Sequence, residues 1–173
     1  MTSSTTRATR WLQLALLACL VSCGYSSRAV GPDGRDLAVF VPLVADPGLD
    51  VDAAGLMDTE LRRAVARTAG WRLSAQGDAP ATLKAELVDV RTGLAAFADP
   101  AQRAGQYVVT VRLKGRLSRR SAKPTVRTKT VTGEAGFLST GGRLEALDGA
   151  GRRALAQATR NAAEKLVWML AAR

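Results

Sequence analysis

The sequence predicts an α+β fold in which two helices pack on one face of a small, mostly antiparallel, four-stranded sheet, in the order β-α-β-β-β-α. Three observations lead to this prediction. Three segments between residues 81 and 138 alternate apolar and polar residues, as half-buried strands do. Two segments with the apolar spacing of a helix lie before and after them. A short apolar run, residues 37–43, comes first and is typical of a buried strand.

The first helix is expected to run from a cap at Asp50 or Asp52 to Gly70, which can end it in the left-handed conformation. Its apolar residues recur on one helical face: Met57, Leu61, Ala64, Val65 and Thr68. The following "WRLS", residues 71–74, is expected to return along the core.

The alternating strands are predicted at residues 81–92, 106–120 and 125–138, with a long loop at 93–105 and a hairpin link at "SAKP". The middle strand has the clearest pattern. One face carries Tyr107, Val109, Val111, Leu113 and Leu117, and the other carries Thr110, Arg112, Lys114 and Arg116. A closing helix is predicted over residues 147–173, with one stripe formed by Leu155, Ala158, Ala162, Leu166 and Met169.

The N-terminal segment has the features of an export signal. Arg7 and Arg10 precede the apolar run 11–21, which fits a signal-peptide core of ~7–15 residues and is shorter than the ~20 residues of a membrane-spanning helix. The segment ends in "LVSCG", which resembles a bacterial lipobox and implies that Cys23 is acylated and becomes the mature N-terminus. A competing match ends at Cys19, but cleavage there would leave two apolar residues on the mature end.

These features divide the chain into a signal peptide (1–22), a lipidated tether (23–34) and a single periplasmic α+β domain (35–173). Gly24 follows the cysteine where Asp would favour retention in the inner membrane, so the expected location is the outer membrane. Stable anchoring needs more than one lipid chain, which the acylated cysteine of a lipoprotein provides.

The composition argues against an enzyme and for an anionic partner. The chain has no His, which removes the usual general base and the commonest zinc ligand, so no metal, cofactor or catalytic residue is expected. Lys and Arg number 25 against 15 Asp and Glu, a formal net charge of +10. For an exported chain the available polyanions are lipopolysaccharide, acidic phospholipid and acidic protein surfaces, rather than nucleic acid. Compositional bias towards Arg is the alternative explanation.

Because both predicted helices cover one side of the sheet, its other face is expected to be open and polar. Five basic residues are predicted to form a ladder on this face that binds lipopolysaccharide: Arg112, Lys114, Arg116, Arg127 and Lys129. A solvated face on which threonines dilute the charge is an equally good interpretation.

The order of several short motifs resembles the LPS-assembly lipoprotein LptE family. The motifs are "CGY" at the lipidation site, "VFVPL", "TAGWRLS", "ATLKAEL", "YVVTVRLKGRL" and the closing "KLVWMLAAR". The resemblance implies a domain with two helices and four strands, anchored in the outer membrane. It also implies that the domain plugs the lumen of a large β-barrel translocon, binds lipopolysaccharide and helps to deliver it to the cell surface. It implies no active site.

A second kind of lipoprotein remains open as an alternative. Lipoproteins with a similar strand–helix–strand start dock on a peptidoglycan synthase or a secretion pore and regulate it. The two interpretations differ in the partner that the domain would bind.

Overall fold

The computed structural model describes residues 36–46, 48, 51–75, 79–97, 105–121, 123–139 and 149–172. The predicted signal peptide, the tether and Cys23 lie outside these residues. Within them, the chain forms these elements in order: β1 (Leu37–Phe40), α2 (Val51–Arg67), β2 (Trp71–Leu73), β3 (Ala81–Phe97), β4 (Gly105–Arg119), β5 (Thr125–Ser139) and α3 (Gly149–Ala171). The predicted α+β class is therefore confirmed.

The described strands form one mixed sheet in the order β2-β1-β3-β4-β5. β1 lies parallel to both of its neighbours, whereas β3, β4 and β5 form an antiparallel meander. The sheet has five strands and not the predicted four, because Trp71–Leu73 pairs with Leu37–Val39 as an additional edge strand. A three-residue strand is too short to produce a detectable alternation in the sequence.

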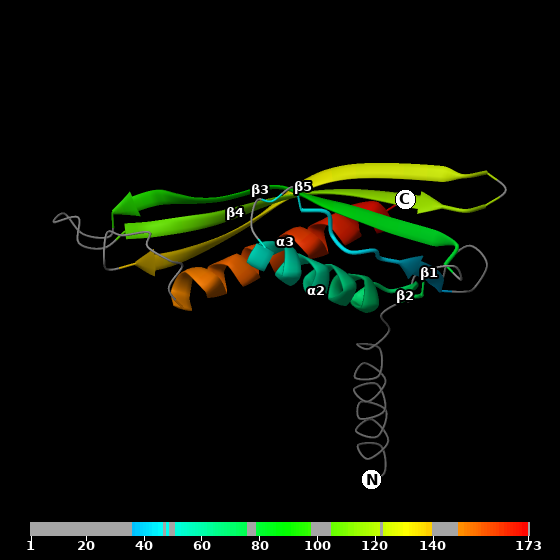
Figure 1. Cartoon of the computed structure of the whole chain (residues 1–173), viewed down its shortest axis with the longest axis horizontal. Helices are drawn as coiled ribbons and strands as arrows, with labels where there is room; N and C mark the ends of the chain where they lie inside the picture. Colours follow the sequence, from blue (N-terminus) through cyan, green and yellow to red (C-terminus); the bar gives the residue numbers. More distant parts are fainter. Residues whose placement is uncertain are drawn as a thin grey trace, which may run out of the picture.

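Both described helices lie on the same side of the sheet, and the opposite face is left open (Figure 1). We call this open side the outer face. The core lies between the helices and the sheet, and its largest fully buried side chains include Met57, Leu61, Leu83, Leu87, Leu113, Leu117, Leu155 and Leu166. None of the helices in the described ranges is long and apolar enough to cross a membrane.

The first helix follows its prediction closely. Met57, Leu61 and Val65 are completely buried, as their spacing requires for one face turned towards the core. The helix ends at Arg67, and Gly70 then adopts a φ of 77°, which lets the chain turn directly into β2. Asp52 lies in the first turn, where a carboxylate is favourable, and the other proposed cap, Asp50, lies outside the described residues.

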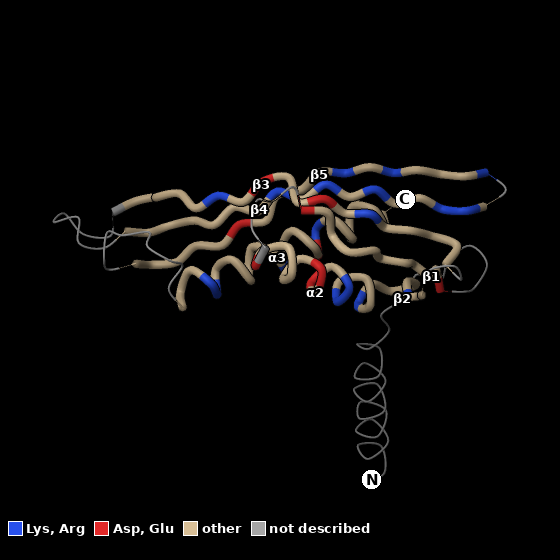
Figure 2. The backbone as a smooth tube through the Cα atoms, in the orientation of Figure 1, with Lys and Arg blue, Asp and Glu red and all other residues tan. Residues whose placement is uncertain are grey.

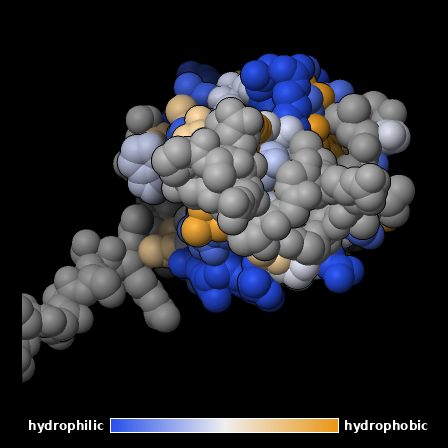
Figure 3. Space-filling model, turned by 90° about the vertical axis from the view of Figure 1, so that its left-hand side faces the viewer, coloured by the Kyte–Doolittle hydropathy of each residue, from blue (hydrophilic) through white to orange (hydrophobic). Residues whose placement is uncertain are grey.

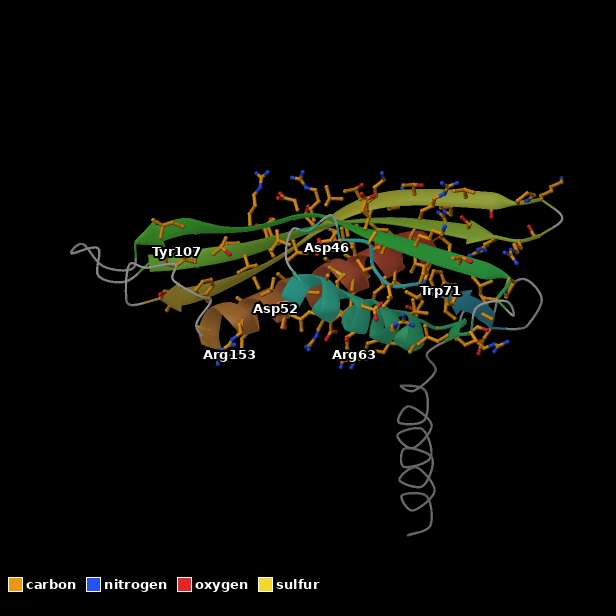
Figure 4. The ribbon with its side chains drawn as sticks, in the orientation of Figure 1. Asp46, Asp52, Arg63, Trp71, Tyr107 and Arg153 are labelled. Atoms are coloured by element: carbon orange, nitrogen blue, oxygen red, sulfur yellow. The ribbon has the colours of Figure 1, made fainter. Side chains whose placement is uncertain are left out.

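The predicted long loop at 93–105 is wrong. β3 continues to Phe97 and pairs with β4 up to the pair Phe97–Gly105. A bulge between Leu87 and Asp89 inserts Val88, so the helix-facing positions of β3 change from odd to even numbers, as far as a second irregularity between Leu94 and Ala96. At the same end of the sheet the rings of Tyr107 and Phe137 stack across β4 and β5, with centroids 5.5 Å apart. Tyr107 is labelled in Figure 4.

α3 packs unusually close to the sheet at two glycines. A Cβ atom added to Gly133 in β5 would meet the carbonyl oxygen of Ala158 and the backbone nitrogen of Ala162. A Cβ atom added to Gly115 in β4 would lie 2.5 Å from Cδ2 of Leu166. The absence of a side chain at Gly133 lets the backbone of α3 come into contact with β5, and its absence at Gly115 makes room for the side chain of Leu166 against β4.

Candidate anion-binding surface

The β4–β5 hairpin carries the strongest concentration of charge in the chain. Residues 112–132 contain eight Lys and Arg residues and no Asp or Glu. In Figure 2 these residues appear as blue segments along the right-hand halves of β4 and β5. The hairpin is therefore the first place to look for a site that binds anions.

Three of the predicted site residues lie where the alternation placed them. Arg112, Lys114 and Arg116 are exposed on the outer face, because Val111, Leu113 and Leu117 between and beside them are buried against the helices. Neighbouring side chains on one face of a strand are about 7 Å apart, so the three cations form a continuous basic row.

The next strand, β3, partly neutralises this row. Glu86 lies opposite Lys114, and its carboxylate is 3.9 Å from the Lys114 ammonium nitrogen. Asp89 lies opposite Arg112 and binds the guanidinium of Arg91 at 2.8 Å. These ion pairs are partly exposed, so each contributes little to stability, but each lowers the local positive potential.

The basic row is strongest at its Arg116 end. Arg116 lies opposite Lys84 in β3 and opposite Thr128 in β5. These three neighbouring residues, one from each strand, include two cations and no acid. Among the described residues, neither Arg116 nor Lys84 has a carboxylate partner within ion-pair distance. Two adjacent unpaired cations repel each other, and a phosphate or carboxylate bound between them would relieve that repulsion.

The prediction that Arg127 and Lys129 complete a ladder on the same face is wrong. In the β4–β5 register, Arg127 lies opposite Leu117 and Lys129 lies opposite Gly115. Residues directly opposite in an antiparallel pair share a face, and Leu117 is buried beneath the sheet. Arg127 and Lys129 therefore lie on the helix-facing side, and threonines 128, 130 and 132 occupy the outer face of β5.

The sequence held a signal that would have given the correct face. Arg127 and Lys129 are odd-numbered, like the apolar residues later in the same strand: Val131, Ala135 and Phe137. Val131 is buried, and Ala135 and Phe137 pack against the core. A strand without a bulge keeps the same parity on each face, so the two basic residues had to share the side of these apolar residues.

Arg127 has a structural contact on its own side of the sheet. Its Nη1 donates a hydrogen bond to the carbonyl oxygen of Leu170, over 3.1 Å. Leu170 lies in the last turn of α3, where backbone carbonyls have no partner within the helix. Nearby in the same hairpin, Nε of Arg119 is buried and has no hydrogen-bond partner among the described residues.

A separate set of charges joins the two helices on the other side of the molecule. Glu60 of α2 is only 8% exposed and accepts hydrogen bonds from Arg63 in the same helix and Arg160 in α3.

Arg63 and Arg153 point away from the sheet in Figure 4. Viewed from the left-hand end of Figure 1, hydrophilic surface lies both at the top, over the outer face, and at the bottom, over the helices (Figure 3).

The chemistry available to the outer face is the binding of anions by charge and hydrogen bonding. Arg and Lys supply several N–H donors each, and the exposed threonine hydroxyls beside them can donate or accept. In the part of the chain that the structure describes, no group of three or more His, Cys, Asp or Glu residues is arranged to hold a metal ion.

No family model matches the chain. No curated protein matches its sequence. Solved structures do share its fold. The hypothetical protein CT253 from Chlamydia trachomatis aligns with a TM-score of 0.51 and 9% identity, over 78% of this chain and 93% of that chain. Protein XCC0632 from Xanthomonas campestris aligns with a TM-score of 0.51 and 14% identity, over 78% of this chain and 84% of that chain.

A minor lipoprotein from Acinetobacter baumannii also aligns, with a TM-score of 0.45 and 10% identity, over 78% of this chain and 91% of that chain. The two alignments with a TM-score of 0.51 bear on the fold alone, because their identities are 9% and 14%. The chain has an α+β fold that the proteins from Chlamydia trachomatis and Xanthomonas campestris share.

Proposed function

We propose that this chain is an outer-membrane lipoprotein of the LptE type. In this proposal Cys23 anchors it, and the domain assembles with a β-barrel translocon and helps to deliver lipopolysaccharide to the cell surface. The observation that carries the proposal is the unpaired basic end of the outer face, around Arg116 and Lys84. The lipobox-like segment at residues 20–24 supports the anchor.

Lipopolysaccharide suits this surface chemically. Its lipid A and core sugars carry phosphate groups, and guanidinium and ammonium groups bind phosphate through short, charge-assisted hydrogen bonds. Arg112, Lys114 and Arg116 stand in a row, so several phosphates of one molecule could contact the face together. The threonines of β5 offer hydroxyl groups to the sugars alongside.

A barrel partner suits the shape of the domain. The outer face is exposed and charged, and the lumen of a wide outer-membrane barrel is also polar. Both helices lie on the other side, so the outer face can meet a partner without disturbing the core (Figure 1).

The binding test is a titration of purified lipopolysaccharide into the full chain in nonionic detergent. The double variant Arg112→Glu, Arg116→Glu should bind at least about tenfold more weakly, because each reversal replaces an attraction to phosphate with a repulsion. The matched control is Arg152→Glu, Arg153→Glu, which makes the same charge change on exposed positions of α3. Equal loss in both variants would mean that only net charge matters and would contradict a site on the outer face.

The partner test is an affinity purification of the tagged lipoprotein from detergent-solubilised outer membrane, followed by mass spectrometry. Recovery of one large β-barrel protein in equal amount is the expected result. Recovery of a peptidoglycan synthase or a secretion-pore subunit instead would overturn the translocon proposal in favour of a regulatory lipoprotein.

A further inference from the structure

The free edge of β5 is an interaction surface separate from the outer face. In the described part of the chain, β5 pairs with β4 on one side only and is 15 residues long. A strand at the edge of a sheet presents a row of backbone N–H and C=O groups that another strand can pair with. Which groups face outwards decides what the edge can bind.

One side chain identifies the outward-facing residues. Nδ2 of Asn161, in α3, donates a hydrogen bond to the carbonyl oxygen of Glu134, over 2.9 Å, so the backbone of Glu134 faces the edge. Backbone groups alternate along an antiparallel strand, so Thr128, Thr130 and Thr132 face the same way. These three residues have no backbone partner on that side among the described residues. We call residues 128–132 the open stretch of the edge, and the contact of Asn161 with Glu134 marks its C-terminal end.

An exposed tryptophan flanks this stretch. Trp168 is 71% exposed and follows Asn161 by about two helical turns, so it lies on the same side of α3. Two contacts bracket it along the helix: Asn161 reaches Glu134, and the Leu170 carbonyl accepts a hydrogen bond from Arg127. Trp168 is therefore beside the part of β5 whose edge is open. A strand added to β5 would place its helix-side residues over the indole ring.

The charge around the edge selects the kind of strand. Lys129 is exposed on the helix-facing side of the open stretch, and the hairpin of residues 112–132 contains no acid. A strand with Asp or Glu at alternate positions would place carboxylates beside Lys129 at a cross-strand distance of about 5 Å. A second copy of this chain would instead bring two basic hairpins together, which its net charge of +10 opposes.

We propose that the open edge of β5, from Thr128 to Thr132, binds an extended acidic segment of a partner protein as an additional strand. Backbone hydrogen bonds hold the segment, and Trp168 and Lys129 select its side chains. This is strand addition at a sheet edge beside a helix. The inference does not depend on lipopolysaccharide or on the identity of the partner, because it uses the backbone of β5 and the side chains of Trp168 and Lys129, and none of the basic residues on the outer face.

The probe is a fluorescein-labelled peptide of about seven residues, a typical strand length, in which Glu and Val alternate. Its binding to the full chain in nonionic detergent is followed by fluorescence anisotropy. Two control peptides separate the contributions. One has Lys in place of Glu, and the other keeps Glu but carries N-methyl groups at alternate residues, so it has the same charge and cannot donate to a strand edge.

The decisive variant is Thr130→Pro, which removes an edge-facing N–H without removing a hydrogen bond to β4. Its control is Thr130→Val, which keeps the N–H. Strand addition predicts that Thr130→Pro and N-methylation each weaken binding at least about tenfold, because several backbone hydrogen bonds depend on the same register. Trp168→Ala is a second variant that leaves the strand untouched, with exposed Leu43→Ala as its control.

Each result decides the question. Selective loss with Thr130→Pro, Trp168→Ala and the N-methylated peptide would support strand addition. Equal binding of the N-methylated and unmodified peptides would show simple attraction between charges and overturn the proposal. A dimer in analytical ultracentrifugation that Thr130→Pro abolishes would also overturn it, since the edge would then be occupied by a second copy. Loss of lipopolysaccharide binding in the outer-face variant would leave these results unchanged.

Discussion

Arg127 and Leu170 are 43 residues apart in the chain, and the guanidinium of the first donates a hydrogen bond to the backbone carbonyl of the second. The contact joins the edge strand β5 to the last turn of α3. A cation at this end of a helix is favourable because the unpaired carbonyls carry partial negative charge. Arg127 therefore stabilises the packing of α3 on the sheet, and the basic residues of the hairpin do not share one role.

Replacing Arg127 with Leu should destabilise the domain by about 1 kcal/mol, because the Leu170 carbonyl loses a charged donor. The measurement is chemical denaturation of the full chain. The control is Lys129→Leu, two residues along on the same side of the strand, which should change stability by less than about 0.5 kcal/mol. Equal destabilisation in both variants would argue against a specific contact with Leu170.

Gly133→Ala should destabilise the domain by about 1–3 kcal/mol, because the new Cβ meets the backbone of α3 and the helix has to shift. Gly136→Ala in the same strand is the control, since its nearest neighbour would be 3.6 Å away, an ordinary contact. Thermal unfolding of both variants checks the prediction. An unaffected Gly133→Ala would mean that α3 does not lie against β5 as described.

Glu60→Gln should cost about 2 kcal/mol, because it removes the buried charge that Arg63 and Arg160 share. Glu164→Gln is the control: this carboxylate is 53% exposed and 3.9 Å from Arg67, so its removal should be nearly neutral. A double-mutant cycle of Glu60 with Arg160 measures the link between the helices directly. A coupling energy near zero between Glu60 and Arg160 would mean that this ion pair does not link the two helices.

Cys23→Ala should abolish incorporation of labelled palmitate and leave the segment 1–22 uncleaved, because the acylated cysteine is the expected cleavage site and anchor. A soluble, fully processed Cys23→Ala protein would contradict the prediction. The prediction is made from the sequence, since Cys23 lies outside the described residues. Cys19→Ala is the matched control and should leave labelling intact. Labelling lost in Cys19→Ala and kept in Cys23→Ala would move the lipidation site to the competing match.

The sequence predicted the strands and helices well wherever the apolar pattern was long and regular. The middle strand, predicted at 106–120, is found at Gly105–Arg119. β3 was predicted to stop at residue 92 because the bulge at Val88 reverses its alternation, and residues 93–97, "GLAAF", have no polar residues to alternate with the apolar ones. β2 could not be predicted, since three residues carry no period and its pairing with β1 depends on a distant part of the chain.

Only three of the five basic residues predicted for the outer face were placed correctly, because alternation within one strand is visible in the sequence and pairing between strands is not. Alternation correctly placed Arg112, Lys114 and Arg116 together, because each lies between buried residues of one strand. Assigning Arg127 and Lys129 to the same face required the register across the "SAKP" link, which charge alone does not define. The acids of β3 that partly neutralise the row, Glu86 and Asp89, were also missed, because pairing across strands is not visible in a single sequence.

The position of β1 decides how the domain withstands a mechanical pull from its N-terminal side. β1 is the first described strand in the chain, and it lies inside the sheet, parallel to β2 on one flank and to β3 on the other. On the β2 flank, Leu37 donates to the Gly70 carbonyl and Val39 accepts from Ser74. A force entering at Asp36 must therefore shear hydrogen bonds on two flanks together. Tension from a lipid anchor would therefore meet a strand that is paired on both of its flanks, and the domain could keep its shape while a bound partner moves relative to the membrane.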